Sequence, residues 1–278
     1  MDQRRYDGSA MTLGIGSDDC GEGGICVFLV DLDAVDEVAA ESYRDLLDPG
    51  EKERFERYKV EGARREYLVG RALVRTALSR FAPVAPADWR FAPNRYGRPA
   101  IFAEQARLAP GLVFNLSHTR GLVALAIGHS CDLGVDVETV VRESAVHDLA
   151  GRYFAPSEAA YARAAEGPEL VERFFAFWTL KEAYIKARGM GLALPLDGFA
   201  YDIAGQGAPT IAFTDACPDD PGRWRFLRRR IGSSHRLALA VSAPQAAIRV
   251  RFVRTVPLSD DEEELERATL PAAAGAAA

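Results

Sequence analysis

Residues 170–188 read LVERFFAFWTLKEAYIKAR, and the interpretation of the whole chain starts from this stretch. Its apolar and aromatic residues recur at helical spacing on several faces, so we expect a long and largely buried helix. Gly189 and Gly191 follow directly, which predicts the end of that helix. Short segments rich in β-branched and aromatic residues come next and predict strands. They cover residues 199–203, 209–213, 224–231, 237–241 and 248–253.

The first half of the chain has a similar order of elements. An apolar segment at 25–33 predicts a strand, and residues 51–81 carry the apolar stripe of a long helix. Further strand candidates follow at residues 113–116, 122–127 and 133–140. A helix followed by antiparallel strands, twice, predicts an α+β fold and argues against a doubly wound parallel sheet.

The chain is expected to divide into four segments. A flexible N-terminal extension would cover 1–24, an N-terminal α+β half 25–130, a C-terminal α+β half with the metal site 131–257, and a disordered tail 258–278. The boundary between the halves rests on the turn-forming residues of 128–132.

Composition excludes several classes of protein. Hydrophobic residues make up 48% of the chain and charged residues 27%, as in ordinary globular proteins. The chain has no apolar run of about 20 residues and no signal-peptide pattern at its start. We therefore expect a cytoplasmic protein without membrane contact. We also expect a monomer. The net charge of −6 gives no basic surplus for nucleic-acid binding.

Two acids alternate within the segment Gly134-Val135-Asp136-Val137-Glu138. On a strand, Asp136 and Glu138 point to the same face while the valines point into the packed side. Neighbouring carboxylates repel each other unless a positive charge lies between them, and Mg2+ is commonly held by such carboxylates together with phosphates. The alternative, a solvent-facing edge of an amphipathic strand, stays open for this segment alone.

The opening helix supplies a third acid and a lysine. Glu182 and Lys186 are four residues apart and share a helix face, which is also the spacing of an ordinary surface ion pair. Because apolar residues surround them, these charges are expected to be buried and to need partners or ligands. Glu182 would complete a metal site, with Lys186 against a phosphate. Lys181 projects elsewhere.

Two further segments carry polar groups that suit phosphate or nucleotide contacts. Ser117 and His118 are neighbours on a predicted strand and so point apart, which argues against a Ser–His catalytic pair. They suit phosphate contacts instead, although a structural histidine is equally compatible. The turn Tyr96-Gly97-Arg98-Pro99 would place Tyr96 and Arg98 near an adenine or its phosphates, or is simply a turn.

Taken in order, these segments resemble a 4'-phosphopantetheinyl transferase of the surfactin-synthetase-activating type. The resemblance covers residues from about 25 to about 253, and G-V-D-V-E with W-x-x-K-E-A-x-x-K are its more specific motifs. It implies two similar α+β halves related by a pseudo-twofold axis, with coenzyme A in the cleft between them. It also implies transfer of the 4'-phosphopantetheine arm to a serine hydroxyl of an acyl or peptidyl carrier protein. Adenosine 3',5'-bisphosphate would leave.

The resemblance also assigns the site residues. Metal ligands would be Asp136, Glu138 and Glu182, with Mg2+ as the cofactor and Mn2+ also compatible. Contacts to coenzyme A would come from Arg54, Tyr96, Gly97, Arg98, Pro99, Ser117, His118 and Lys186. After Pro49 this chain has Gly50 and Glu51 where similar enzymes place a basic residue, so Arg54 or Lys52 would take the 3'-phosphate.

The catalytic groups are expected to be Glu182 as the base, directly or through water, and Lys186 at the departing phosphate. The carrier protein supplies the nucleophile. Two other functions stay open: a coenzyme A-binding module without transfer, and a Mg2+-dependent hydrolase of nucleotide pyrophosphates. The arginine-rich residues 223–230 would form either a docking patch for an acidic carrier protein or one solvated strand face.

Overall fold

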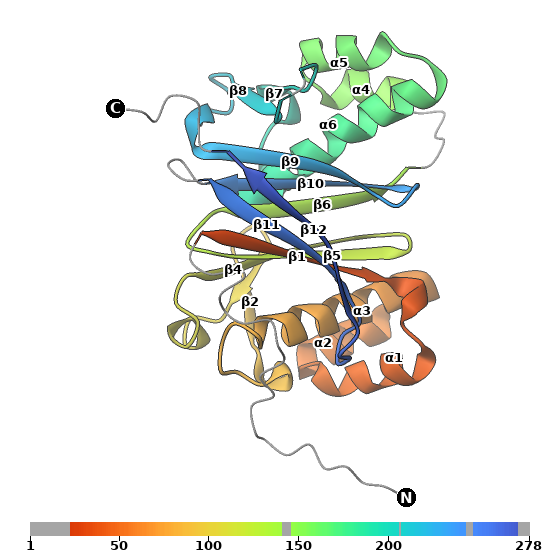
Figure 1. Cartoon of the computed structure of the whole chain (residues 1–278), viewed down its shortest axis with the longest axis vertical. Helices are drawn as coiled ribbons and strands as arrows, with labels where there is room; N and C mark the ends of the chain where they lie inside the picture. Colours follow the sequence, from red (N-terminus) through yellow and green to blue (C-terminus); the bar gives the residue numbers. More distant parts are fainter. Residues whose placement is uncertain (1–22, 141–145, 206, 243–246, 272–278) are drawn as a thin grey trace, which may run out of the picture.

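The computed structural model describes residues 23–140, 146–205, 207–242 and 247–271. The α-helices span α1 Glu37–Tyr43, α2 Pro49–Arg57, α3 Glu61–Leu78, α4 Val146–Tyr153, α5 Pro156–Arg163 and α6 Gly167–Arg188. They form two groups, α1 to α3 and α4 to α6, with the sheets between them (Figure 1). The α+β class expected from the sequence is therefore confirmed, as is an arrangement in two halves.

The larger sheet combines strands from both ends of the chain. Its five strands are ordered β12-β11-β1-β5-β4. They span β1 Gly24–Asp31, β4 Leu112–Thr119, β5 Leu122–His129, β11 Ile248–Thr255 and β12 Glu262–Leu270. Strand β1 pairs antiparallel with β5 and parallel with β11, so Val27 lies beside both Ala126 and Phe252.

The second sheet has three antiparallel strands in the order β6-β10-β9. They span β6 Leu133–Thr139, β9 Trp224–Ile231 and β10 His235–Ser242. Helix α6 packs on their outer face (Figure 1). Short strand pairs complete the described fold: β2 Phe91–Pro93 with β3 Pro99–Ile101, and β7 Phe199–Asp202 with β8 Thr210–Phe213.

Strand alternation decides which side chains fill which core. Val135 and Val137 of β6 belong to the apolar core between the two sheets, together with Val27 and Leu29 of β1. On β10 the alternate residues Ala238 and Ala240 face the helical side and pack in the core that contains α6. Their small side chains are consistent with close packing of α6 on this sheet.

Local signals explain where the helices begin and end. Asp48 and Glu51 form a capping box at the start of α2, and α6 ends at Gly189 with a φ of 61°. The single helix expected over 51–81 is wrong, because Tyr58 and Val60 adopt extended backbone and separate α2 from α3. Within the described ranges, every helix is too short or too polar to cross a bilayer.

Side chains join the two sheets where β4 lies against β6. Alternate residues of β4 accept hydrogen bonds from backbone N–H groups of β6, in the manner of a neighbouring strand. These bonds run from Val135 N to Asn115 Oδ1 (2.8 Å), Val137 N to Ser117 Oγ (3.3 Å) and Thr139 N to Thr119 Oγ1 (3.1 Å). The outer edge of β6 is thereby bonded to β4.

The expected segment boundaries differ from the structure at the C-terminal side. Residues of β11, expected within the half 131–257, pair with β1 in the larger sheet, and residues 262–270 of the expected disordered tail 258–278 form β12. The acids of β12 stay ordered because arginines neutralise them. The pairs are Glu262 with Arg80, Glu263 with Arg254, Glu264 with Arg251 and Arg267, and Glu266 with Arg229. The extension 1–24 falls almost wholly outside the described residues, as do 272–278.

Candidate functional site

A glycine brings strand β6 against helix α6 at the candidate site. A Cβ on Gly134 would lie 2.0 Å from the carbonyl oxygen of Ala183 and 2.5 Å from the backbone nitrogen of Ala187. Both are backbone atoms, so only glycine permits this approach. Asp136 lies two residues further along the strand and therefore shares the face that is turned toward α6.

Lys186 connects α6 to Asp136. Its Nζ donates hydrogen bonds to Asp136 Oδ1 at 2.6 Å and to Ser117 Oγ at 2.8 Å, and Ser117 Oγ donates to the same carboxylate oxygen at 3.1 Å. Asp136 is 3% exposed, and its Oδ2 is buried with no hydrogen-bond partner among the described residues. An unsatisfied buried oxygen of this kind is costly unless a donor or a cation reaches it.

The other two acids repel Asp136. Burial and the negative charge of Asp136 raise the pKa of Glu138 to about 7, although the hydrogen bond from Trp178 Nε1 (3.2 Å) and the charge of Lys186 oppose this. Burial and the same Asp136 charge raise the pKa of Glu182, which Lys186 partly offsets. The structure therefore brings the three carboxylates and the lysine into one electrostatic cluster.

No group of three histidine, cysteine, aspartate or glutamate side chains within the described ranges is already arranged to hold a metal ion. The assignment of Asp136, Glu138 and Glu182 as metal ligands therefore stays a prediction. The chemistry of the donor set fits a hard cation, because these are oxygen ligands with one orphaned atom and two raised pKa values.

Ser117 and His118 point to opposite sides of β4, as expected for neighbours on a strand. Ser117 is buried in the Lys186 network, whereas the exposed His118 has its Nδ1 3.1 Å from Glu66 Oε2 on α3. The two side chains do not form a catalytic pair. Their predicted contacts to phosphates are not tested by this arrangement.

The turn at 96–99 lies against the C-terminal end of α6. The Arg98 guanidinium donates to the backbone carbonyls of Ala187 at 2.7 Å and Leu133 at 2.9 Å. Nearby, Asn94 Nδ2 donates to the carbonyl of Gly189 at 2.8 Å. Arg98 therefore tethers the β2–β3 turn to both β6 and α6. The predicted contact of Arg98 to an adenine or phosphate stays a prediction. The side chain of Tyr96 is exposed, and its predicted contact also stays a prediction.

Arg54 is exposed on α2, where its guanidinium lies 5.3 Å from the centre of the Tyr67 ring. Among the described residues, Arg54 forms no hydrogen bond or ion pair with Asp136, Glu138 or Glu182. Arg54 and the exposed Lys52 both stay candidates for the 3'-phosphate.

Sequence reasoning missed several residues that support the cluster. Gly134 lay inside the quoted motif, but its role depends on a helix that is distant in sequence. The apolar pattern of α6 predicts packing for Trp178, but its indole nitrogen also donates a hydrogen bond to Glu138. Lys181 is fully buried, forms an ion pair with Glu158 at 2.8 Å and donates to the carbonyls of Leu196 and Phe199. The charge of Lys181 is therefore paired inside the helical layer and not beside Asp136, Glu138 and Glu182.

Two family models and several known proteins match this chain. Residues 132–241 match the family described as the 4'-phosphopantetheinyl transferase superfamily, and residues 38–130 match the N-terminal region of 4'-phosphopantetheinyl transferases. The 4'-phosphopantetheinyl transferase Sfp of Bacillus subtilis is 32% identical over 177 residues, which are 63% of this chain and 75% of that protein. This chain belongs to the 4'-phosphopantetheinyl transferase family.

Three further matches cover smaller shares of this chain. The 4'-phosphopantetheinyl transferase HetI of Nostoc sp. is 34% identical over 53% of this chain and 61% of its own length. A second Bacillus subtilis 4'-phosphopantetheinyl transferase is matched over 66% of its length. The match thus spans slightly less than two thirds of these two relatives. A solved structure, the holo-acyl-carrier-protein synthase of Thermotoga maritima, aligns with 51% of this chain at 20% identity and a TM-score of 0.33.

Proposed function

We propose that this chain transfers the 4'-phosphopantetheine arm of coenzyme A to a serine hydroxyl of an acyl or peptidyl carrier protein. The serine oxygen would attack the phosphorus that carries the pantetheine, and adenosine 3',5'-bisphosphate would leave. Beside family membership, one observation supports the proposal: Lys186 of α6 binds Asp136 of β6, and the charges of both act on Glu138 and Glu182. The proposal includes that the enzyme is a monomer and acts in the cytoplasm.

The carboxylates would hold Mg2+, or Mn2+, which accepts similar oxygen ligands. The orphaned Asp136 Oδ2 supports this assignment, as do the burial and the repulsion that raise the pKa values of Glu138 and Glu182. When bound, the ion would neutralise charge on the pyrophosphate and orient it for displacement.

Glu182 is the proposed base. A carboxylate with a raised pKa is a better proton acceptor at neutral pH than an ordinary one, so Glu182 would take the serine proton directly or through water. Lys186, which is partly exposed beside it, would stabilise the departing phosphate. The separation of Ser117 from His118 supports a nucleophile supplied by the partner protein.

The remaining coenzyme A contacts are proposed by family resemblance. Ser117 and His118 would face the phosphates, the turn from Tyr96 to Pro99 the adenine, and Arg54 or Lys52 the 3'-phosphate. Arg98 would act through the shape of the turn, because two of its bonds already go to backbone carbonyls.

The test is mass spectrometry of an apo carrier protein after incubation with coenzyme A, Mg2+ and this protein. A phosphopantetheine-sized mass gain on the carrier is expected, and it should be lost with Glu182→Gln. Absence of a gain across several carriers would contradict the proposal. A parallel reaction without any carrier distinguishes hydrolysis, because only a hydrolase would release adenosine bisphosphate there.

A further inference from the structure

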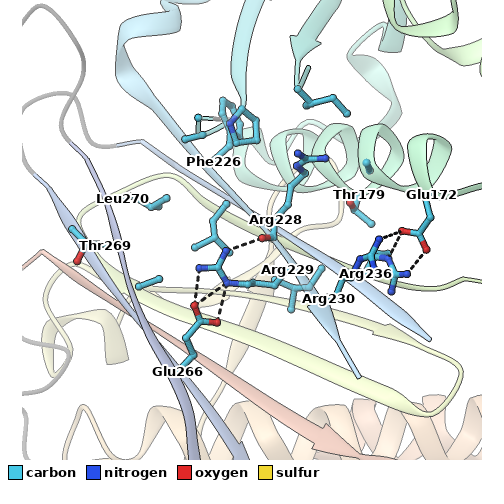
Figure 2. Close-up of a pocket in the computed structure, with 18 of the residues that line it drawn as sticks. Glu172, Thr179, Phe226, Arg228, Arg229, Arg230, Arg236, Glu266, Thr269 and Leu270 are labelled. Carbon is cyan, nitrogen blue, oxygen red and sulfur yellow. Dashed lines mark hydrogen bonds and ion pairs between the residues drawn. The ribbon is translucent and has the colours of Figure 1, made fainter. Parts of the chain in front are cut away.

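A second feature of the molecule is a cavity of about 830 Å³ between β9, β12 and α6. None of the carboxylate cluster residues Asp136, Glu138, Glu182 and Lys186 lines it. Six arginines and two glutamates do, together with apolar side chains such as Phe226 and Leu270 (Figure 2). This is a strongly positive cavity in a protein with a net charge of −6.

Most of these arginines have partners within the protein. Arg229 reaches across to β12, and Arg230 and Arg236 share one glutamate of α6 (Figure 2). The bonds join Arg229 to Glu266, Arg230 and Arg236 to Glu172, Arg173 to Glu169 and the Tyr161 carbonyl, and Arg267 to Glu264. Most of the charge of the arginine-rich strand is therefore paired within the protein, while Arg230 stays largely exposed. The docking patch considered from the sequence stays a prediction.

Arg228 is the exception. It lies opposite Ala238 on β10 and, like Phe226, faces the helical side of the sheet, so its side chain projects toward α6 (Figure 2). Its guanidinium has no hydrogen-bond or ion-pair partner among the described residues, and burial lowers its pKa. The Arg228 side chain is half-buried, and its guanidinium nitrogens are not among the buried polar atoms without a partner. They are therefore open to the cavity, where the oxygens of an anion can replace water on them.

We infer that this cavity is a second ligand site, which binds a small amphiphilic anion with its phosphate or carboxylate group on Arg228. A guanidinium offers paired donors that match either group. The apolar walls suit a hydrocarbon portion, and the volume lies in the usual range of about 300–1,000 Å³ for small-molecule sites. The volume of the cavity is that of a small-molecule site, so a small molecule is the proposed occupant. This inference does not depend on the proposed transfer reaction.

Isothermal titration calorimetry of the full chain tests the inference with octyl phosphate, octanoate and inorganic phosphate. Saturable binding of octyl phosphate or octanoate is expected, and the preferred one of the two identifies the head group. Arg228→Gln should weaken that binding by ~10-fold or more, since a charge-assisted hydrogen bond is lost. Arg107→Gln removes an exposed guanidinium elsewhere and should leave the affinity unchanged.

Three results would overturn the inference. These are unchanged affinity in Arg228→Gln, no saturable binding of either amphiphile up to about 10 mM, and inorganic phosphate binding as tightly as octyl phosphate. If Arg228→Gln does not fold, Arg228→Lys replaces it. That variant keeps the charge but loses the paired donors, so it should bind more weakly, and unchanged affinity would contradict the contact.

Discussion

Lys186 Nζ lies 2.6 Å from Asp136 Oδ1, and this contact joins helix α6 to strand β6 at the candidate site. Asp136 is almost fully buried, whereas the Lys186 side chain is 27% exposed. The lysine can therefore compensate the buried charge and still be reached by a substrate from solvent.

Replacing Lys186 by methionine should impair both stability and transfer. Asp136 would be left buried without its cation, which we expect to lower the free energy of unfolding by about 1–3 kcal/mol, less than for a fully buried pair. Loss of a charge that faces the leaving phosphate should reduce kcat by about 100-fold. Urea unfolding and a carrier-modification assay measure the two effects. The control for stability alone is Lys52→Met, which replaces an exposed lysine of α2. An equal loss of unfolding free energy in the two variants would contradict the role of Lys186 beside Asp136.

Stability should fall as pH rises from about 4.5 to about 7. The folded pKa of Glu138, about 7, lies above its ordinary value of 4.5, so the folded state binds more protons in this window. The contribution of Glu138 to the free energy of unfolding is fully present below pH 4.5 and is lost as the pH rises to about 7. Because this group is partly exposed and screened by solvent, the loss is on the order of 1 kcal/mol. Urea unfolding across this range should show a smaller slope for Glu138→Gln. The exposed Glu53→Gln should keep the wild-type slope.

Mg2+ should raise the melting temperature if the carboxylates bind it. Ten-fold excess over the dissociation constant stabilises a protein by about 1.4 kcal/mol, which corresponds to roughly 2–5 °C for a chain of this size. The shift should be larger at pH 8 than at pH 6, because metal and protons compete for Glu138 and Glu182. Asp136→Asn should remove it, and an unchanged shift in that variant would place the ion elsewhere.

Gly134→Ala should be strongly destabilising. The added Cβ meets backbone atoms of α6 at 2.0 and 2.5 Å, so the helix must move away from β6 at a cost of about 3 kcal/mol. Gly62 on α3 has nothing within 4 Å of such a Cβ, and Gly62→Ala should be neutral or stabilising by a few tenths of a kcal/mol. Thermal unfolding of the two variants makes the comparison, and similar melting temperatures would exclude the close approach as a constraint.

Short-range patterns were sufficient to predict much of the fold. The alternation of Asp136 and Glu138 with valines predicted strand faces correctly, and Gly189 predicted the end of α6. The proximity of Asp136 to Lys186 came from family motifs, since spacing alone cannot bring together residues 50 apart.

Long-range pairing was beyond the reach of such patterns. The acids of β12 suggested a disordered tail because their arginine partners lie on other strands, as with Glu266 and Arg229. Likewise, nothing local to Ile248–Thr255 indicates that it would pair with β1 rather than with its sequence neighbours. That Arg228 has no partner among the described residues is likewise a property of the three-dimensional contacts, which the local sequence cannot indicate.

The pairing of β1 with β11 has a consequence for synthesis of the protein. Strand β1 is among the first described segments to leave the ribosome, and one of its edges has no partner until residues 248–255 follow. For most of translation an apolar strand therefore presents an open edge, which is a template for aggregation. We expect the nascent chain to need shielding by chaperones during this interval. Pulse proteolysis of ribosome-bound chains should detect protection of β1 only after β11 has emerged.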